Sequence, residues 1–255
     1  MGDEEKQPAT KASPRSIRHG SREGTTFGNI LLRRYLQNTK WVTNSTSGAA
    51  MKKFRATAEI FKKYATQYDF DFLMLAAQGY QESMLNQAMT SPRGAVGIMQ
   101  VIPRYAAAPP IGIPDVTNTD SNIHAGTKML RHIVDTRFND PKIGRVDKAL
   151  FSFASYNAGP NRISRLRRTA AERNLDPNAW FGNVELVAAE DIGEETVTYV
   201  RNIYKYYVAY KLAADQARSR PKGRSTSSPF SLLDSTRPQE MWAQWKMFLG
   251  HISQY

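Results

Sequence analysis

The stretch that decides the fold runs from Leu73 to Ser83 and reads LMLAAQGYQES. At about 100° per residue on a helix, Glu82 lies within about 20° of Leu75 and about 60° of Gly79. The apolar stripe of this predicted helix includes Phe72, Leu75, Ala76 and Gly79. A carboxylate at the end of such a stripe loses part of its hydration, which raises its pKa toward the range of a general acid. The alternative is an ordinary solvated glutamate in the last helical turn.

Helical periodicity continues on both sides of this stretch. Before it, apolar residues recur at spacings of three and four from Phe54 to Ala65, and Asp69 and Asp71 are candidate N-caps for the helix through Ser83. After it, further helices are predicted over residues 122–138, 147–156, 160–173 and 194–218. Repeated Pro and Gly between residues 91 and 114 predict loops rather than regular structure. Alternating strand patterns are scarce, so the sequence predicts a mostly α fold.

The chain divides into a helical domain and two flanks. Residues 51–215 carry the helical pattern and are predicted to form the folded domain. Residues 1–25 are rich in Ser, Thr, Gly and charge, which predicts a disordered lead-in, and residues 26–50 are interpreted as a linker. Residues 216–255 are predicted to form a basic linker and a short C-terminal helix that carries Trp242 and Trp245. Both flanks are expected to be flexible.

The composition narrows the class of protein but does not choose a partner. Hydrophobic residues make up 41% and charged residues 23% of the 255 residues, which is typical of a soluble globular protein. No apolar run approaches the ~20 residues that span a bilayer, and residues 1–22 show no secretory signal. The absence of cysteine excludes disulfides and leaves the compartment open. A net charge of +12 is compatible with nucleic acid, anionic lipid or cell-wall polymer as a partner.

Four short motifs follow one another in the predicted domain. They are Glu82-Ser83, Gly97-Ile98-Met99-Gln100, Ser155-Tyr156-Asn157-Ala158-Gly159 and Tyr199-Val200-Arg201-Asn202-Ile203. In this order and spacing they resemble the motifs of the SLT-type lytic transglycosylase domain, over about residues 50–212. The stretch 195–203 is most similar to the membrane-bound lytic transglycosylase F branch. Ile98 stands where Leu is usual and Ser155 where Ala is usual, and both changes are small.

The resemblance implies a lysozyme-like fold and a lyase that acts on peptidoglycan in the cell envelope, with no cofactor. Glu82 would protonate the oxygen between N-acetylmuramic acid and N-acetylglucosamine. Once ionised, Glu82 would take the proton of the C6 hydroxyl, which closes a 1,6-anhydro ring without consuming water. A residue that is first acid and then base needs a pKa near neutrality. In the branch named above the catalytic domain follows a solute-binding-protein-like module, so residues 26–50 are either a linker or a stub of such a module.

The same resemblance implies the substrate-binding residues. The loop from Gly97 to Gln100 would line the cleft, with Met99 as a wall and Gln100 as a polar contact to substrate. Tyr156 and Tyr199 would lie near Glu82 as hydroxyl donors and sugar-stacking rings, and core packing is the alternative for each. Asn157 would contact an acetamido group. Ser83 would fix the turn after Glu82 at the edge of the substrate site.

Three other functions are weighed against this one. A hydrolytic muramidase on the same scaffold would need a second carboxylate to activate water, for which the candidates are Glu185, Glu190, Asp191, Glu194 and Glu195. A peptidoglycan-binding module without turnover would keep the fold alone. Nucleic acid is not an expected partner, because the sequence has no helix-turn-helix, zinc or RNA-recognition signature. No metal site is expected, since His19, His124, His132 and His251 are scattered.

Overall fold

The computed structural model describes residues 44–218, and these residues form helices joined by loops. The helices are α4 (Gly48–Tyr68), α5 (Phe72–Ser83), α6 (Pro103–Ala107), α7 (Thr119–Arg137), α8 (Arg145–Ala158), α9 (Pro160–Glu172), η1 (Trp180–Val184), α10 (Glu185–Asp191) and α11 (Glu194–Arg218). The β contacts in this range are isolated bridges that involve Thr90, Val96 and Val101. The prediction of a mostly α fold is therefore confirmed. Between residues 44 and 218, no helix combines the length and apolar character that crossing a membrane requires.

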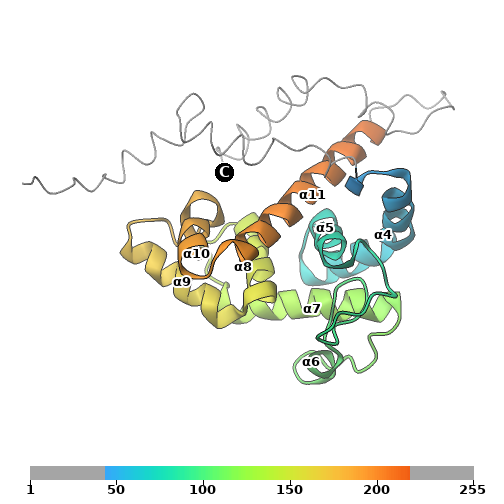
Figure 1. Ribbon diagram of the computed structural model, residues 1–255, viewed down its shortest axis with the longest axis horizontal. Helices are drawn as coiled ribbons and strands as arrows, with labels where there is room; N and C mark the ends of the chain where they lie inside the picture. Colours follow the sequence, from blue (N-terminus) through green and yellow to red (C-terminus); the bar gives the residue numbers. More distant parts are fainter. Residues whose placement is uncertain (1–43, 219–255) are drawn as a thin grey trace, which may run out of the picture.

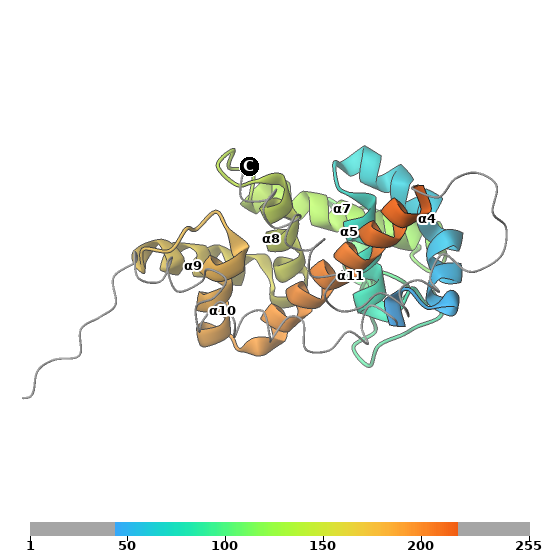
Figure 2. The same cartoon turned by 90° about the horizontal axis from the view of Figure 1, so that it is seen from above.

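The helices α7 and α11 connect two groups of helices (Figure 1). α7 packs on α4 in one group and on α8 and α9 in the other, while α11 packs on α5, α8 and α10. Seen from above, α11 crosses the molecule from α10 toward α4 (Figure 2), where Tyr210 stacks on Phe54 with ring centroids 4.8 Å apart. Residues at opposite ends of the sequence therefore meet along α11.

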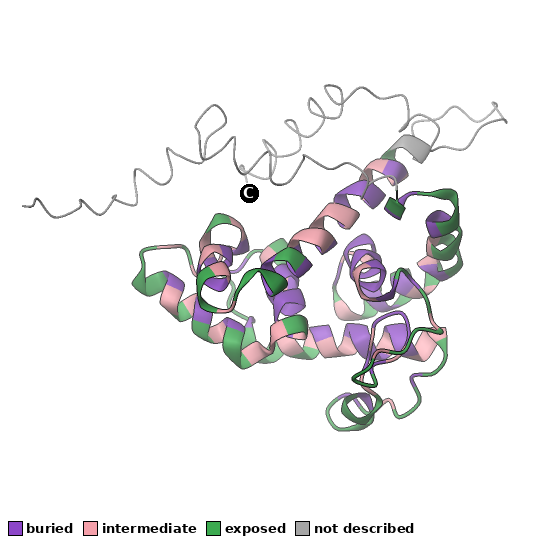
Figure 3. Cartoon of the chain, viewed as in Figure 1, coloured by how far each residue is buried: buried purple, intermediate pink, exposed green. Residues whose placement is uncertain are grey.

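α5 is the central helix, and it is buried on all sides rather than along one stripe. Every residue from Leu73 to Tyr80 is buried (Figure 3), whereas Phe72, which was predicted to belong to the apolar stripe, is only half-buried. The prediction of a single apolar face was wrong because α4, α11 and the loop after α5 enclose the helix together. A Cβ on Gly79 would lie 2.9 Å from Ile98 of that loop, so the loop packs directly on the helix.

The ends of α4 and α5 are set by polar side chains. Asp71 caps α5, since its Oδ1 accepts a hydrogen bond of 2.8 Å from the backbone N–H of Leu73. Asp69, the other predicted N-cap, instead ends α4 in the left-handed conformation. Ser47 caps α4, while Ser45 and Thr46 just before it are buried. The folded part therefore begins before residue 51, inside the segment predicted to be a linker. The predicted lead-in, most of that linker and the C-terminal helix with Trp242 and Trp245 lie outside the described residues.

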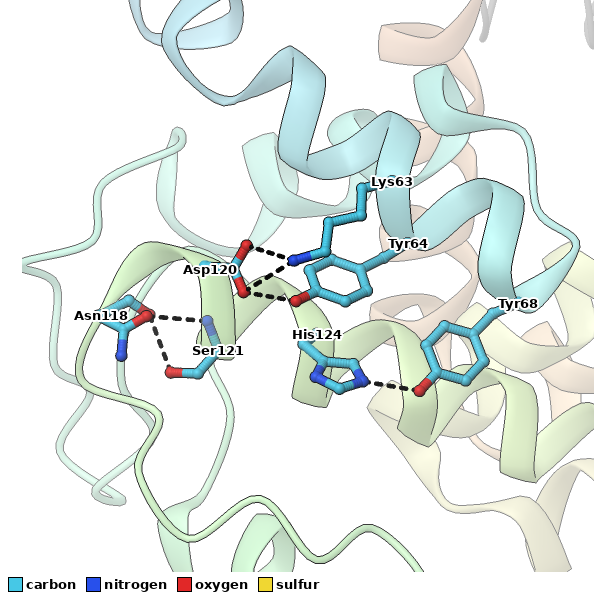
Figure 4. Close-up of polar contacts among 7 residues, drawn as sticks. All are labelled: Lys63, Tyr64, Tyr68, Asn118, Asp120, Ser121 and His124. Atoms are coloured by element: carbon cyan, nitrogen blue, oxygen red, sulfur yellow. Dashed lines mark hydrogen bonds and ion pairs between the residues drawn. The ribbon is translucent and has the colours of Figure 1, made fainter.

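A polar and aromatic cluster joins α4 to α7 (Figure 4). The Tyr64 hydroxyl donates to Asp120 at 2.5 Å, and Lys63 Nζ lies 3.1 Å from the same carboxylate. The His124 ring stacks on Tyr64 at 4.4 Å, and its Nε2 lies 2.7 Å from the Tyr68 hydroxyl. Burial lowers the pKa of His124, so its ring is neutral at neutral pH. This cluster fixes the first turns of α7 against α4.

Three short helices were not predicted. α6 lies inside the segment 91–114, where Pro103 occupies the first helical position and so begins a helix rather than breaking one. η1 and α10 depend on Trp180, which is fully buried and meets Phe151 edge-on at 5.9 Å. The backbone N–H of Trp180 donates to Asp147 at 2.8 Å. Such long-range anchors are invisible to periodicity in the sequence.

Candidate active site

Glu82 lies in the last turn of α5, immediately before the helix ends at Ser83. Met84 follows in the left-handed conformation, with φ of 54°. The Ser83 hydroxyl lies 3.0 Å from the carbonyl oxygen of Ile98 and 3.2 Å from that of Gly79. Ser83 is itself buried, so it ties the end of α5 to the following loop. These contacts agree with the expectation that Ser83 fixes the turn after Glu82, and its contact with substrate stays a prediction.

Tyr199 of α11 is the hydrogen-bond partner of Glu82. Its hydroxyl donates to Oε1 of Glu82 at 2.5 Å and accepts from Nε2 of Gln78 at 3.3 Å. Gln78 and Glu82 are one helical turn apart, so both side chains project from the same face of α5. The extensive packing of α11 on α5 brings Tyr199 to this face across a large separation in sequence.

The environment of Glu82 raises the pKa of its carboxyl group far above the ordinary value. Burial raises the pKa of Glu82 to about 7, while the hydrogen bond from Tyr199 opposes the shift by stabilising the ionised form. Near neutral pH the group is therefore divided between its protonated and ionised forms. A carboxyl with this pKa is able both to deliver a proton and to take one up.

Tyr156 of α8 lies near this carboxylate, close enough for the charge of Glu82 to act on it. Its hydroxyl donates to the backbone carbonyl of Met99 at 2.8 Å, which connects α8 to the loop after α5. Burial and the negative charge of Glu82 both raise the pKa of Tyr156 well above its ordinary value. The same two causes act on Tyr199. Both tyrosines are therefore neutral hydroxyl donors in the working pH range.

The loop from Gly97 to Gln100 is held by Asn122 of α7. The Asn122 side chain accepts from the backbone N–H of Met99 at 2.8 Å, and it donates to the carbonyls of Val96 at 2.9 Å and Val116 at 3.0 Å. Gly97 adopts a φ of +76°, and a Cβ there would lie 2.4 Å from Nδ2 of Asn122. This close approach requires glycine at position 97.

The structure separates the two predicted loop contacts. Met99 is fully buried and its side chain packs against Gly126, and its expected role as a wall of the cleft stays a prediction. Its contribution is the carbonyl that anchors Tyr156. Gln100 is half-buried in the left-handed conformation, with Nε2 donating to the carbonyl of Gly97 at 2.9 Å. Much of its amide therefore serves the loop itself.

An open cleft of about 410 Å³ lies beside Tyr199. Its lining residues come from α5, α8 and α11, and they are Gln81, Asn157, Glu194, Glu195, Thr198, Tyr199 and Asn202. Asn157 is exposed, and its Oδ1 accepts a hydrogen bond of 2.7 Å from the Thr196 hydroxyl. This bond leaves the amide nitrogen of Asn157 available to a ligand in the cleft.

The other carboxylates in this region fall into two groups. Glu185 is buried and pairs with Arg201 at 3.6 Å, while Glu190 and Asp191 pair with Arg173 on the surface. The second group, Glu194 and Glu195, is exposed on the lining of the cleft. Between residues 44 and 218, no three His, Asp or Glu side chains gather closely enough to hold a metal ion.

The sequence reasoning missed Gln78 and Asn122. Gln78 interrupts the apolar run from Leu73 to Tyr80, and a polar side chain inside a buried helix needs a partner. This interruption of the apolar run is the sequence feature that could have identified Gln78. Asn122 carries no such sign, because its three partners are backbone groups of loops, and two of them, on Val96 and Met99, are far from it in the sequence.

Comparisons with known proteins find similar proteins that are described as transglycosylases. The model of the family described as "Transglycosylase SLT domain" matches residues 59–178. The membrane-bound lytic murein transglycosylase F of Pseudomonas fluorescens (strain Pf0-1) is 31% identical over 160 residues, covering 58% of this chain and 32% of the relative. The protein of the same name from Marinobacter nauticus is 34% identical over 161 residues, covering 58% and 31%. The chain thus spans about a third of the length of the curated relatives that it matches.

Solved structures include similar chains. The 70 kDa soluble lytic transglycosylase SLT70 from Escherichia coli is 25% identical, with a TM-score of 0.47, and the match covers 73% of this chain and 30% of that one. An inactive mutant of lytic transglycosylase Slt from Pseudomonas aeruginosa is 20% identical, with a TM-score of 0.48, covering 79% and 33%.

Proposed function

We propose that the chain is a lytic transglycosylase that cleaves peptidoglycan, a proposal supported by the match of residues 59–178 to the family described as "Transglycosylase SLT domain". One observation carries the proposal. Glu82 is a largely buried carboxyl whose pKa is raised to about 7 and whose Oε1 accepts a hydrogen bond from Tyr199. Tyr199 also lines an open cleft, so the carboxyl is joined to the place where a glycan strand would lie. The relatives named above are membrane-bound enzymes of murein, which supports a location in the cell envelope.

The first chemical step uses Glu82 as an acid. Protonated Glu82 gives its proton to the oxygen between N-acetylmuramic acid and N-acetylglucosamine, and the bond from that oxygen to C1 of the muramic acid breaks. The N-acetylglucosamine leaves with a new hydroxyl, and positive charge develops on the ring that remains. The carboxyl is now an ionised carboxylate, and the Tyr199 hydroxyl stabilises it by donating to Oε1.

The second step uses the same residue as a base. The C6 hydroxyl of the muramic acid attacks C1 and releases its proton to Glu82, which closes a 1,6-anhydro ring. Glu82 returns to its protonated form and no water is consumed. One residue can serve both steps because a pKa of about 7 makes neither form dominant near neutrality.

The remaining predicted site residues take supporting roles in this proposal. The free amide nitrogen of Asn157 faces an acetamido group of the substrate, and Gln100 borders the strand at the far side of the loop. Tyr156 holds the loop through Met99 and presents its ring beside Glu82. Met99 and Ser83 support the floor of the site from within the core.

Hydrolysis is the second candidate function, because Glu194 and Glu195 line the same cleft as Tyr199. An inverting hydrolase places a second carboxylate at about 6.5–9.5 Å from the acid, leaving room for a water molecule. The exposure of Glu194 and Glu195 supplies none of the burial that would tune either one as a base near pH 7.

Mass spectrometry of the soluble products from purified peptidoglycan tests the proposal. The main muropeptide is expected to be lighter than the hydrolysed one by one water and to resist borohydride, because it has no free reducing end. Glu82→Gln is expected to remove nearly all product, with a loss of at least about 10²- to 10⁴-fold. Glu194→Gln and Glu195→Gln serve as matched variants on the cleft lining and are expected to retain the anhydro product.

Each alternative has its own outcome in the same experiment. Reducible products of full mass, lost in one of the Glu194 or Glu195 variants, would establish a hydrolase instead. A wild-type chain that sediments with peptidoglycan but releases no muropeptide would establish a binding module.

A further inference from the structure

Gln78 has an unusual position one turn before Glu82. It is fully buried, and it lies in the part of α5 that is enclosed by α4, α11 and the following loop. Its Nε2 donates to the Tyr199 hydroxyl at 3.3 Å, while Tyr199 donates to Glu82 at 2.5 Å. The three side chains therefore form a line in which Gln78 reaches Glu82 only through Tyr199.

At the Gln78 end of this line, one polar atom lacks a hydrogen-bond partner. Oε1 of Gln78 is buried and has no hydrogen-bond partner among the described residues. A buried polar atom without a partner destabilises a fold by about 1–3 kcal/mol. The line as it stands fits an ionised Glu82, which can only accept and so takes the proton of Tyr199.

A protonated Glu82 allows the opposite arrangement as well, because it gains a donor while it keeps acceptor capacity. Its own O–H can donate to the Tyr199 oxygen, and the Tyr199 O–H then needs another acceptor. A half-turn of the Gln78 amide places Oε1 where Nε2 was, which supplies that acceptor and gives the unpaired oxygen a partner. An amide is suited to this because it carries a donor and an acceptor of nearly the same shape.

We propose that Gln78 is a positioning residue that turns its amide with the proton on Glu82, so that the Tyr199 hydroxyl supports both forms of the carboxyl. The proposal rests on the proposed function, since a single residue that is acid and then base needs a partner for each form. In the acid step the amide presents Oε1 to Tyr199, and in the base step it presents Nε2. Nothing moves except one amide and two hydroxyl protons, so the reversal needs no change in the packing of α5 on α11.

The other titratable groups around this line are few. Tyr156 faces Glu82 from α8, and its hydroxyl is engaged with the carbonyl of Met99. Glu194 and Glu195 lie on the cleft lining at the start of α11. These groups stay the same when Gln78 is replaced, so a change in the titration of Glu82 reports on the line itself.

The test compares Gln78→Met in the wild-type and Tyr199→Phe backgrounds. Methionine has a similar size and can neither donate nor accept strongly, so it removes the acceptor that a protonated Glu82 needs. The pKa of Glu82 is read by carbon NMR of its carboxyl in the protein without substrate, assigned with Glu82→Gln. We expect Gln78→Met to lower this pKa by up to about one pH unit, the equivalent of one hydrogen bond. In the Tyr199→Phe background the same replacement is expected to leave the pKa of Glu82 unchanged.

Turnover gives the second readout. The alkaline limb of the pH profile of kcat is expected to move down with the pKa, with kcat at neutral pH reduced by up to about fivefold and KM little changed. Ser152→Ala is the control: it removes a fully buried hydroxyl that bonds only within α8. It is expected to leave the alkaline limb of the kcat profile in place. Gln78→Leu is a second variant should methionine disturb the helix.

An unmoved pKa of Glu82 in both Gln78 variants would overturn the proposal, as would an equal shift in the Tyr199→Phe background. Either result would leave Gln78 as a packing residue. A wild-type chain without muropeptide release would instead overturn the proposed function, and the NMR titration would still decide the role of Gln78.

Discussion

Glu82→Gln is expected to stabilise the fold at neutral and alkaline pH even though it removes turnover. Burial raises the pKa of Glu82 to about 7 in the native chain, against 4.5 for the ordinary carboxyl. The native state therefore holds the proton more tightly than the unfolded state does. The resulting stability is fully present below pH 4.5 and is lost as the pH rises through 7. Glutamine has nearly the shape of a protonated glutamate and does not titrate, so it keeps this stability at every pH.

The size of the gain follows from the same two values. The interval from 4.5 to about 7, at about 1.4 kcal/mol for each pH unit, sets an upper limit of about 3 kcal/mol at about pH 8. Water that reaches the partly exposed carboxylate reduces the measured gain below this limit. At about pH 4.5 the wild-type carboxyl is almost fully protonated in the native state, so the two chains are expected to differ by a few tenths of a kcal/mol at most.

Urea unfolding followed by circular dichroism, repeated from about pH 4.5 to about pH 8, measures this difference. Glu172→Gln is the matched control, because Glu172 is exposed on α9 and its replacement is expected to change stability little at either pH. If Glu82→Gln gains nothing at the alkaline end, or gains equally at both ends, then Glu82 is not a carboxyl held near neutrality by burial. The acid–base argument for turnover would then lose its basis as well.

Three further predictions concern the scaffold. Because the pKa of His124 is lowered, its contribution to the stability of the fold is present above the ordinary value of 6.5 and is lost as the pH falls below it. His124→Gln is therefore expected to reduce the fall of Tm with acidification. Parallel curves of Tm against pH for the two chains would refute this. Gly97→Ala is expected to destabilise the chain by about 3 kcal/mol in urea unfolding, because the new Cβ would clash with Asn122. Gly112 also has a positive φ but has open space around it, so Gly112→Ala is expected to destabilise the chain by only about 1 kcal/mol. Equal losses in the two variants would contradict the clash. Asn122→Ala leaves the N–H of Met99 without its partner, while the carbonyls of Val96 and Val116 keep their bonds from Val101 and Gln87. A loss of about 1–3 kcal/mol in unfolding and a sharp fall in activity are expected, and a wild-type activity would count against the role of this loop.

The parts of the fold that sequence predicted well are those governed by local rules. α11 has the predicted bounds, residues 194–218, because its long apolar periodicity is uninterrupted by Pro or Gly. α9 begins at Pro160, a position where proline favours the start of a helix. α5 begins after its cap Asp71, as one of the two candidate caps predicted. In each case a few adjacent residues contain the information.

The rest depends on partners that are distant in sequence. The burial of Met99 follows from its contact with Gly126 on α7, so no feature of residues 97–100 distinguishes a core methionine from a cleft wall. The same holds for Ser83, whose hydroxyl is used by the carbonyl of Ile98. η1 and α10 exist because Trp180 fills a place beside Phe151. Motif spacing identified segments that the fold brings together around Glu82, but it did not separate residues on the cleft lining from residues that hold the loop.

Polar residues inside a fully enclosed helix are the most informative case. On a surface helix a glutamine in an apolar run has water as its hydrogen-bond partner, so its presence does not indicate a functional site. In α5 every residue from Leu73 to Tyr80 is buried, so Gln78 is fully enclosed and Glu82 is largely so, at a cost in free energy that apolar side chains would avoid. The two residues meet at one hydroxyl, that of Tyr199, and their combined donors and acceptors can satisfy it in either proton state of the carboxyl. The cost of burying them is therefore tied to the property that a single acid–base residue needs, which is a hydrogen-bond partner for each of its two forms.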